Sequence, residues 1–430
     1  MRALSPQRRL DPPPAVRKIA TRLTEAGFET WCVGGAVRDA LLGQAHADWD
    51  LATAATPPEV RSLFRRTVPH GIEFGTVGVL DSSGVMHEVT TFRRDVQHDG
   101  RHAVVEYGVS LDDDLARRDF TINAIAFSPS SGELRDPFGG QDDLHRGVIR
   151  AVGDPQARMV EDRLRALRAF RFAGRFGFEI DPATWEAVVN SAPHLARLSR
   201  ERVRQELEKT MKQVRYPSRS LRLWQRSGAF ASLVPELKNA GPASLAAADH
   251  IGLPDATARP ELAQSRARNR LTTLFLELPA ESARRTMEGL RASNRDSEIM
   301  THHVRQWHAL GVAMRQADAS TDDATLRRWA SAIGRTQFTD FMRVATARWL
   351  AEGAAFSAGM VRMYRRGTQI AFHDPLAVAD LAVDGGDLME LGIPAGPEVG
   401  QTLRRLLDAV VEDPSRNRRD LLLEMARSPR

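Results

Sequence analysis

Two aspartates one residue apart, Asp48 and Asp50, have the clearest capacity for chemistry in this chain. In a strand, side chains at i and i+2 point to the same face, so the two carboxylates would lie side by side. Like charges at that spacing repel unless a cation lies between them, and Mg²⁺ favours carboxylate and phosphate oxygens. The pair therefore indicates a divalent-metal site for phosphoryl transfer, although the same spacing also occurs on solvated strand edges.

A glycine pair precedes the aspartates and strengthens that interpretation. Gly34 and Gly35 follow an apolar run at 30–33. This order predicts a strand that enters a tight turn, where residues without side chains let the backbone approach a ligand closely. A short helix ended by Gly43 is expected next. An isolated Gly-Gly is also typical of an ordinary turn, but its short distance from the acidic pair favours a joint role.

The segment 34–39 (Gly-Gly-Ala-Val-Arg-Asp) and Asp48-Trp49-Asp50 together resemble the active-site signature of polymerase-β-type nucleotidyltransferases. More narrowly, they resemble the family of class II tRNA nucleotidyltransferases, or CCA-adding enzymes, and bacterial poly(A) polymerases. The resemblance implies an α+β protein, with a mixed-sheet nucleotidyltransferase head followed by all-α domains. It implies that Asp48 and Asp50 are catalytic and bind Mg²⁺, and that the nucleotide triphosphate is bound by Gly34, Gly35 and Arg38.

A third acidic residue, Glu88, lies in a predicted β-hairpin. The segments 74–80 and 85–93 alternate apolar and polar residues, and the turn-type residues 81–84 separate them. The resemblance implies that Glu88 lies near the aspartate pair as a third catalytic acid. An ordinary surface glutamate is the alternative.

The polar segment 94–109 is predicted to be a loop. Members of the resembled family carry a flexible loop here that takes part in adding the terminal adenosine. The segment has a similar length in this chain. This argues against an enzyme that stops after two cytidines.

A second motif, Arg117-Arg118-Asp119-Phe120-Thr121-Ile122-Asn123-Ala124, combines cations with hydrogen-bonding side chains. Adjacent guanidinium groups suit triphosphate oxygens. Asp119 and Asn123 are four residues apart, so on a helix they would share a face and could bind ribose hydroxyls. A capped, charged helix start is the alternative. The string resembles the family's ribose and triphosphate motif, which implies that Arg118, Asp119 and Asn123 bind nucleotide.

A third motif begins a helix predicted over 161–173. Asp162 and Arg165 would be neighbours at i and i+3, and together they could offer acceptors and donors to the base edges of C and A. An intrahelical salt bridge worth tenths of a kcal/mol is the alternative. Glu161-Asp162-x-x-Arg165 resembles the family's protein-templating motif. The resemblance implies that Asp162 and Arg165 read the base and that Glu161 orients them.

Composition indicates a soluble multidomain protein. The chain has 430 residues, of which 42% are hydrophobic and 27% charged, with a formal net charge of +5. A positive excess permits a polyanionic partner. No apolar run approaches the roughly 18 residues of a membrane span, and the single cysteine, Cys32, excludes an intrachain disulfide. We therefore expect a cytoplasmic protein with no membrane partner.

The remaining chain has an almost entirely helical pattern from about residue 180. With the resemblance, this predicts a catalytic head at 1–148, a base-recognising neck at 149–215, a helical body at 216–345 and a tRNA-binding tail at 346–430. His302, His303 and His308 have no acidic residue in His-Asp spacing, so a helix-surface or core role is favoured over a metal site.

The expected activity is template-independent addition or repair of the 3′-terminal CCA of tRNA from CTP and ATP, with pyrophosphate release. The alternatives are a poly(A) polymerase, an enzyme that adds only CC or only A, and a non-catalytic RNA-binding homologue. The segment 375–400 resembles the tail of shorter bacterial tRNA nucleotidyltransferases and favours tRNA. The intact aspartate pair argues against the non-catalytic alternative.

Overall fold

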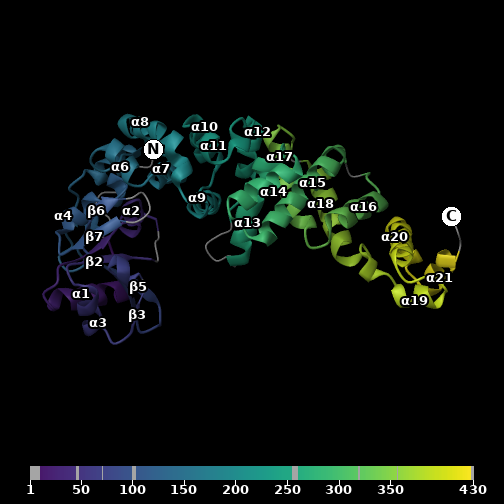
Figure 1. Ribbon diagram of the computed structural model, residues 1–430, viewed down its shortest axis with the longest axis horizontal. Helices are drawn as coiled ribbons and strands as arrows, with labels where there is room; N and C mark the ends of the chain where they lie inside the picture. Colours follow the sequence, from purple (N-terminus) through teal and green to yellow (C-terminus); the bar gives the residue numbers. More distant parts are fainter. Residues whose placement is uncertain are drawn as a thin grey trace. The chain divides into compact units, whose positions relative to one another are not determined.

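The computed structural model describes residues 10–44, 48–69, 71–98, 103–253, 260–317, 320–355 and 357–427. The chain forms two compact units (Figure 1). The first comprises the residues up to Glu206 together with Leu223–Leu233, and the second comprises Leu207–Arg222 and the residues from Val234 onward. Each unit is described by itself below.

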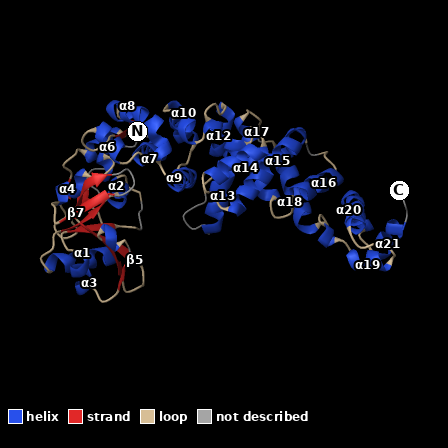
Figure 2. Ribbon diagram, viewed as in Figure 1, coloured by secondary structure: helices blue, strands red, loops and turns tan. Residues whose placement is uncertain are grey.

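The first unit is built on a mixed seven-stranded sheet with the strand order β3-β4-β5-β2-β1-β8-β9. All strands of the described chain belong to this unit, and the second unit is helical (Figure 2). The strands of the sheet are β1 Thr30–Val33, β2 Asp50–Thr53, β3 Thr67–Pro69, β4 Thr76–Leu80, β5 Met86–Thr91, β8 Ala126–Phe127 and β9 Leu134–Arg135. The predicted α+β architecture is confirmed.

The register of the central strands brings the acidic residues together. β1 and β2 are antiparallel, and Val33 pairs with Asp50. β2 and β5 are parallel, and Leu51 pairs with Val89, so Asp50 and Glu88 precede this pair on neighbouring strands. The predicted hairpin is present as antiparallel β4 and β5.

Buried apolar residues of the central strands show that this sheet is covered. Every residue of β1 is buried. One apolar cluster joins β1, β2 and β8 to the helix α4 (Leu111–Ala116), through Trp31, Ala52, Leu115 and Ala126 among others. The helix α1 (Pro14–Glu25) buries its apolar stripe as its 3.6-residue spacing predicts.

The other helices of this unit lie before, between and after the strands in the chain. They are α2 Gly35–Leu41, α3 Pro57–Leu63, α5 Gly140–Arg146, α6 Pro155–Glu161, α7 Leu164–Phe176, α8 Pro182–Ser191 and α11 Ala229–Leu233, with α9 Arg200–Gln213 and α10 Ser218–Arg226 contributing residues to both units. Short 3₁₀ turns are η1 Ile72–Phe74, η2 Thr121–Asn123 and η3 Ala192–Arg197. β10 Val148–Ile149 pairs in parallel with β11 Glu179–Ile180.

Two local predictions are wrong. The segment expected to be a loop at 94–109 contains an antiparallel hairpin of β6 (Arg93–His98) and β7 (Ala103–Tyr107), while 99–102 lie outside the described residues. The helix expected over 161–173 is two helices, since α6 ends at Glu161 and α7 begins at Leu164. The Asp162 carboxylate accepts the backbone N–H of Leu164, and this local bond competes with the helical pattern.

The second unit contains two apolar cores. Its helices are α12 Pro242–Ala247, α13 Pro260–Thr272, α14 Ala280–Gly289, α15 Asn294–Gln316, α16 Asp323–Ile333, α17 Phe338–Ala351, α18 Ala358–His373, α19 Gly385–Glu390, α20 Pro397–Glu412 and α21 Arg419–Arg427, and its 3₁₀ turns are η4 Pro235–Leu237, η5 Ala248–His250, η6 Thr273–Phe275, η7 Val378–Asp380 and η8 Pro414–Arg416. Helices α15–α18 share one core around Phe341 and Trp349, and α19–α21 share another around Leu406. No helix in the described ranges has the length and apolarity needed to cross a membrane.

Candidate active site

The acidic corner of the site, Asp48, Asp50 and Glu88, lies at the start of β2 and on the neighbouring β5. Trp49 between the aspartates is buried, whereas Asp48 is exposed. Burial, together with repulsion from Asp48 and Glu88, raises the pKa of Asp50 to about 6, although the charge of Arg118 lowers it. The three carboxylates expected from the sequence therefore interact with one another, and positive charge only partly offsets their repulsion.

The glycine turn lies against Arg118, which comes from a segment some eighty residues away. Gly34 has φ +77°, a conformation that favours glycine, and a Cβ there would lie 3.0 Å from Nη1 of Arg118. At Gly35 a Cβ would lie 3.5 Å from Nη2 of Arg38. A side chain at Gly34 would displace the guanidinium group that also interacts with Asp50. The turn thus brings backbone, cation and acidic pair together.

Asp114, which the sequence analysis did not single out, holds the two adjacent arginines. Its carboxylate accepts hydrogen bonds from Nη2 of Arg117 at 2.8 Å and from Nη2 of Arg118 at 3.0 Å. Its side chain is buried, which would raise its pKa, but the two guanidinium charges outweigh burial and lower it. Asp114 therefore stays ionised and orients Arg118 toward Gly34.

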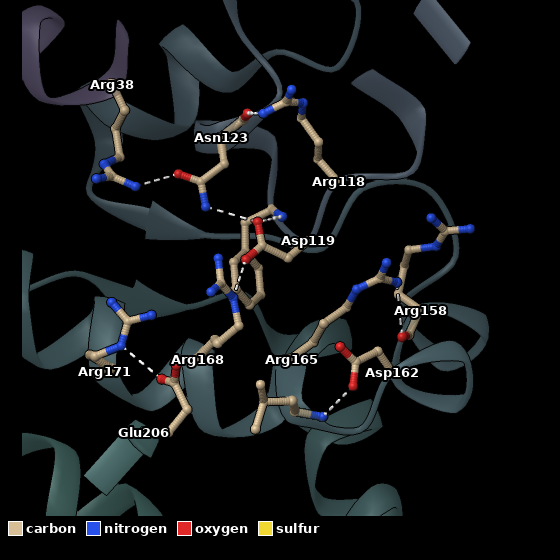
Figure 3. Close-up of polar contacts among 12 residues, drawn as sticks. Arg38, Arg118, Asp119, Asn123, Arg158, Asp162, Arg165, Arg168, Arg171 and Glu206 are labelled. Carbon is tan, nitrogen blue, oxygen red and sulfur yellow. Dashed lines mark hydrogen bonds and ion pairs between the residues drawn. The ribbon is translucent and has the colours of Figure 1, made fainter. Parts of the chain in front are cut away.

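A chain of polar contacts runs from α2 to α7 (Figure 3). Nη1 of Arg38 donates to Oδ1 of Asn123, whose Nδ2 donates to Oδ1 of Asp119 at 2.8 Å. Oδ2 of Asp119 accepts a bond from Nε of Arg168 at 2.7 Å. Asp119 and Asn123 therefore meet as expected, but through a turn that ends in η2 and not on one helix. The reason is that Phe120 is extended and donates its N–H to the Asp119 carboxylate.

Burial and charge act in opposite directions on Asp119. Burial would raise its pKa, but the charge of Arg168 and hydrogen bonds from Asn123, Arg168 and Phe120 lower it to about 2. Arg38 is also buried, and its guanidinium carbon lies 5.1 Å and 4.9 Å from the ring centroids of Phe172 and Phe176. Arg38, Asp119, Asn123 and Arg168 are called the floor of the site below.

The three residues of the expected templating motif are positioned separately. Nη1 of Arg165 donates to Glu161 at 2.7 Å, and Nη2 donates to the carbonyl of Arg117 at 2.9 Å. Asp162 accepts a bond from Nη2 of Arg202 at 2.7 Å. The expectation that Asp162 and Arg165 are neighbours on one helix is wrong, because the chain bends between them.

Comparison with known proteins identifies the family. The model of the poly A polymerase head domain matches residues 30–150, that of the RNA- and SrmB-binding site of polymerase A matches 177–240, and that of tRNA nucleotidyltransferase domain 2 matches 270–426. The CCA-adding enzyme of Lactiplantibacillus plantarum is 33% identical over 418 residues, which are 96% of this chain and 95% of that protein. The chain belongs to the CCA-adding enzyme family.

Two further relatives agree with this membership. The CCA-adding enzyme of Leuconostoc mesenteroides is 48% identical over 208 residues, about half of either chain. The crystal structure of the Bacillus stearothermophilus CCA-adding enzyme in complex with CTP is similar with a TM-score of 0.77 and 30% identity, covering 96% of both chains. The chain is thus a nucleotidyltransferase of the CCA-adding family, and its fold agrees with that of a solved member.

The donor set of the acidic corner fits a hard divalent cation of the kind expected in this family. The donors are carboxylate oxygens, and Asp48 and Asp50 are close enough to raise the pKa of Asp50. Within the described ranges, no three acidic, histidine or cysteine side chains form a complete metal cage. Two carboxylates are nevertheless the usual protein share of a Mg²⁺ site, because waters and substrate phosphates supply the other ligands.

The sequence motifs did not identify Asp114 and Arg168 as residues of the candidate site. Asp114 pairs with the adjacent arginines of its own segment, and Arg168 pairs with Asp119 from another segment. Asp114 carried a signal, since it precedes Arg118 by four residues, the spacing of a helical ion pair. The pairing of Arg168 with Asp119 spans 49 positions and had no comparable signal.

Proposed function

We propose that this protein adds or repairs the 3′-terminal CCA of tRNA, using CTP and ATP and releasing pyrophosphate. The observation that carries the proposal is the meeting of the acidic pair, the Gly34 turn and Arg118 beside a network that reaches α7. The candidate metal ligands, phosphate-binding groups and base-reading side chains that we assign below all lie within one unit. The CTP complex of the related Bacillus enzyme supports a nucleotide site of this kind.

In the proposed reaction, Asp48 and Asp50 would hold Mg²⁺, and a metal bound there would supply Lewis-acid activation of the RNA 3′-hydroxyl and charge neutralisation for the leaving pyrophosphate. Glu88 keeps the local potential negative beside this pair. The backbone at Gly34 and Gly35 admits the triphosphate closely, and Arg118 donates to its oxygens while Asp114 fixes its orientation. The products are an RNA longer by one nucleotide and pyrophosphate.

Ribose and base are assigned to the other side of the site. Asn123 and Asp119 orient the ribose, with Arg38 and Arg168 holding their side chains. Asp162 accepts hydrogen bonds from the exocyclic amino group that C and A share, and Arg165 donates to the ring acceptors. Glu161 fixes the Arg165 guanidinium through their ion pair. We assign these roles to a head at 1–148 and a neck at 149–215, with a body at 216–345 and a tRNA-binding tail at 346–430.

We also propose that the protein acts in the cytoplasm. Its single cysteine is buried in β1, and burial raises the pKa of the Cys32 thiol. A buried protonated thiol is unreactive toward oxidants, so the fold does not depend on an oxidising compartment.

The test uses three tRNA transcripts that end before CCA, after C and after CC. Each is incubated with Mg²⁺ and with CTP, ATP or both, and products are resolved at single-nucleotide length. Addition that stops after CCA is the expected result. Long A tails would identify a poly(A) polymerase, arrest at CC or addition of A alone would identify a partial enzyme, and no pyrophosphate release would indicate a non-catalytic protein.

A further inference from the structure

The helical second unit contains a cavity of about 270 Å³ between η5, α13, α17 and α18. Apolar side chains form part of its wall: Ile251, Met342, Ala347, Met360 and Val361. Tyr364, which is half-buried, adds an aromatic ring. The volume is close to the lower limit for small-ligand pockets, so it suits a single base or nucleoside and not a folded peptide segment.

Basic groups surround this cavity. His250, Arg266, Arg343 and Arg365 line it, and none of the lining residues is acidic. Arg343 is paired with Asp340 at 2.6 Å. Arg266 contacts the carbonyl of Gly252 at 3.4 Å, and neither Arg266 nor Arg365 has an acidic partner within the described ranges. Among the described residues, the cavity therefore combines apolar walls with two arginines that lack an acidic partner, which favours a ligand with a flat apolar part and an anionic group.

Arg215, Tyr216 and Arg219 form a second basic surface in the same unit, called the ridge below. Tyr216 is 44% exposed, and the guanidinium carbons of Arg215 and Arg219 lie 5.5 Å and 5.8 Å from its ring centroid. Exposed aromatic rings flanked by arginines are typical platforms for stacked bases, and the guanidinium groups suit phosphates.

One buried side chain links the ridge to the cavity wall. Nε of Arg270 donates to the carbonyl of Ile251 at 2.7 Å, and its Nη1 donates to the carbonyls of Met211 and Val214 at 2.8 Å and 2.9 Å. Nη2 donates to the carbonyl of Arg215 at 3.3 Å. Arg270 is fully buried, and its hydrogen bonds connect the backbone beside Tyr216 to the backbone of the cavity wall at Ile251.

We propose that this cavity holds one unstacked nucleotide of the RNA substrate, while the ridge around Tyr216 binds the adjoining backbone. The base packs against Tyr364 and the methionines, and Arg266 and Arg365 bind its phosphate. An RNA is favoured over an acidic peptide because of the cavity's size and its connection to the ridge through Arg270. The inference rests on the proposed function, since it names a second contact for the same RNA.

The test measures tRNA affinity and steady-state CCA addition for four variants of the full chain. Tyr364→Ala and Arg365→Ala remove the ring and the cation, and Thr346→Leu narrows the cavity without changing charge. Arg362→Ala is the matched control, because Arg362 is an exposed arginine of α18 that does not line the cavity. We expect roughly tenfold weaker tRNA binding for the first three, with KM for CTP unchanged, and at most about twofold for the control.

Several outcomes would overturn the inference. Equal effects of Arg365→Ala and Arg362→Ala would indicate diffuse electrostatics, and a normal Thr346→Leu variant would indicate that no base enters the cavity. AMP binding is also measured by calorimetry. If Tyr364→Ala loses an AMP-binding site but binds tRNA with unchanged affinity, the cavity binds a free nucleotide and not the RNA substrate. If the wild-type protein does not extend tRNA, the proposed function is wrong. If the wild-type protein extends tRNA and the cavity variants bind and extend tRNA equally well, only the inference about the cavity is wrong.

Discussion

The acidic corner around Asp50 and the floor around Asp119 use the same side chain in opposite electrostatic settings. Both aspartates are removed from solvent to a large degree, and burial favours the neutral form of each. At Asp50, neighbouring carboxylates add to that effect and the pKa rises to about 6. At Asp119, Arg168 and three hydrogen bonds reverse it and the pKa falls to about 2.

The contrast separates carboxylates whose repulsion a metal would relieve from carboxylates, such as Asp119, that already bind neighbouring side chains. A carboxylate group with uncompensated repulsion raises the free energy of the folded protein until a cation binds. A carboxylate whose oxygens are already bonded has little left to offer a cation, but it fixes its partners. The predictions below test this division.

The largest effect is expected at the acidic corner. Asp50→Asn should reduce CCA addition roughly 10³-fold or more, because the metal loses a charged ligand. The same change removes a repelled charge, so Tm should stay constant or rise. Single-nucleotide extension assays and thermal unfolding measure the two effects.

Asp112→Asn is the control for this substitution, since Asp112 pairs with Arg135 at the surface of the same unit. Its activity should be close to that of the wild type. Turnover of Asp50→Asn within tenfold of the wild type would exclude the metal role. A large decrease in Tm would show that the Asp50 carboxylate stabilises the folded protein even without a bound cation.

The floor should respond in the opposite way. Asp119→Asn breaks the contact with Arg168 and should lower the free energy of unfolding by about 2 kcal/mol or more, because it leaves a partly buried guanidinium without its anion. Activity should fall less than for Asp50→Asn. Arg168→Gln should have a similar cost, and the double variant should cost less than the sum. Additive losses in urea unfolding would show that the pair does not act as a unit.

The pH dependence sharpens the same comparison. The pKa of Asp119 is about 2 in the folded state against 3.8 when unperturbed, so the unfolded chain binds the proton first as pH falls. Its stabilisation is complete above pH 3.8 and is lost as pH falls toward 2. The difference in unfolding free energy between wild type and Asp119→Asn should therefore shrink by about 1 kcal/mol between pH 5 and pH 3. A gap that stays constant over this range would contradict a depressed pKa.

The division also explains which features the sequence predicts. The Asp-x-Asp spacing placed Asp48 beside Asp50, and the family resemblance placed Glu88 near them, so their meeting was foreseeable. The bend at Asp162 was not, because a single side-chain bond to Leu164 decides it against a continuous helical pattern. The sequence of β6, Arg-Arg-Asp-Val-Gln-His, is polar, and that of β7, Ala-Val-Val-Glu-Tyr, does not alternate strictly, so neither strand has the apolar alternation that identifies a strand.

Long-range ion pairs are the other part that sequence reasoning did not reach. Arg168 could have paired with any of several acids, and only the folded chain brings it to Asp119. The same holds for Asp39, whose carboxylate accepts bonds from Arg38 and, 136 positions away, from Arg175. The motifs therefore predicted what the site contains, while its internal support required the structure.

The smallest effect on stability is expected at Asp162, which lies neither in the acidic corner around Asp50 nor in the floor around Asp119. Its side chain and that of Arg202 are 27% and 33% exposed, so their ion pair is partly screened, and asparagine can still cap Leu164. Asp162→Asn should therefore change the free energy of unfolding by less than about 1 kcal/mol. Base selection should change more, because a carboxylate only accepts hydrogen bonds whereas an amide also donates and can pair with O4 of uracil. The measurement is kcat/KM for CTP and UTP on a tRNA lacking CCA, with Asp112→Asn as control. We expect the preference for CTP to fall in Asp162→Asn alone; an unchanged preference would remove Asp162 from base reading and leave it a capping residue.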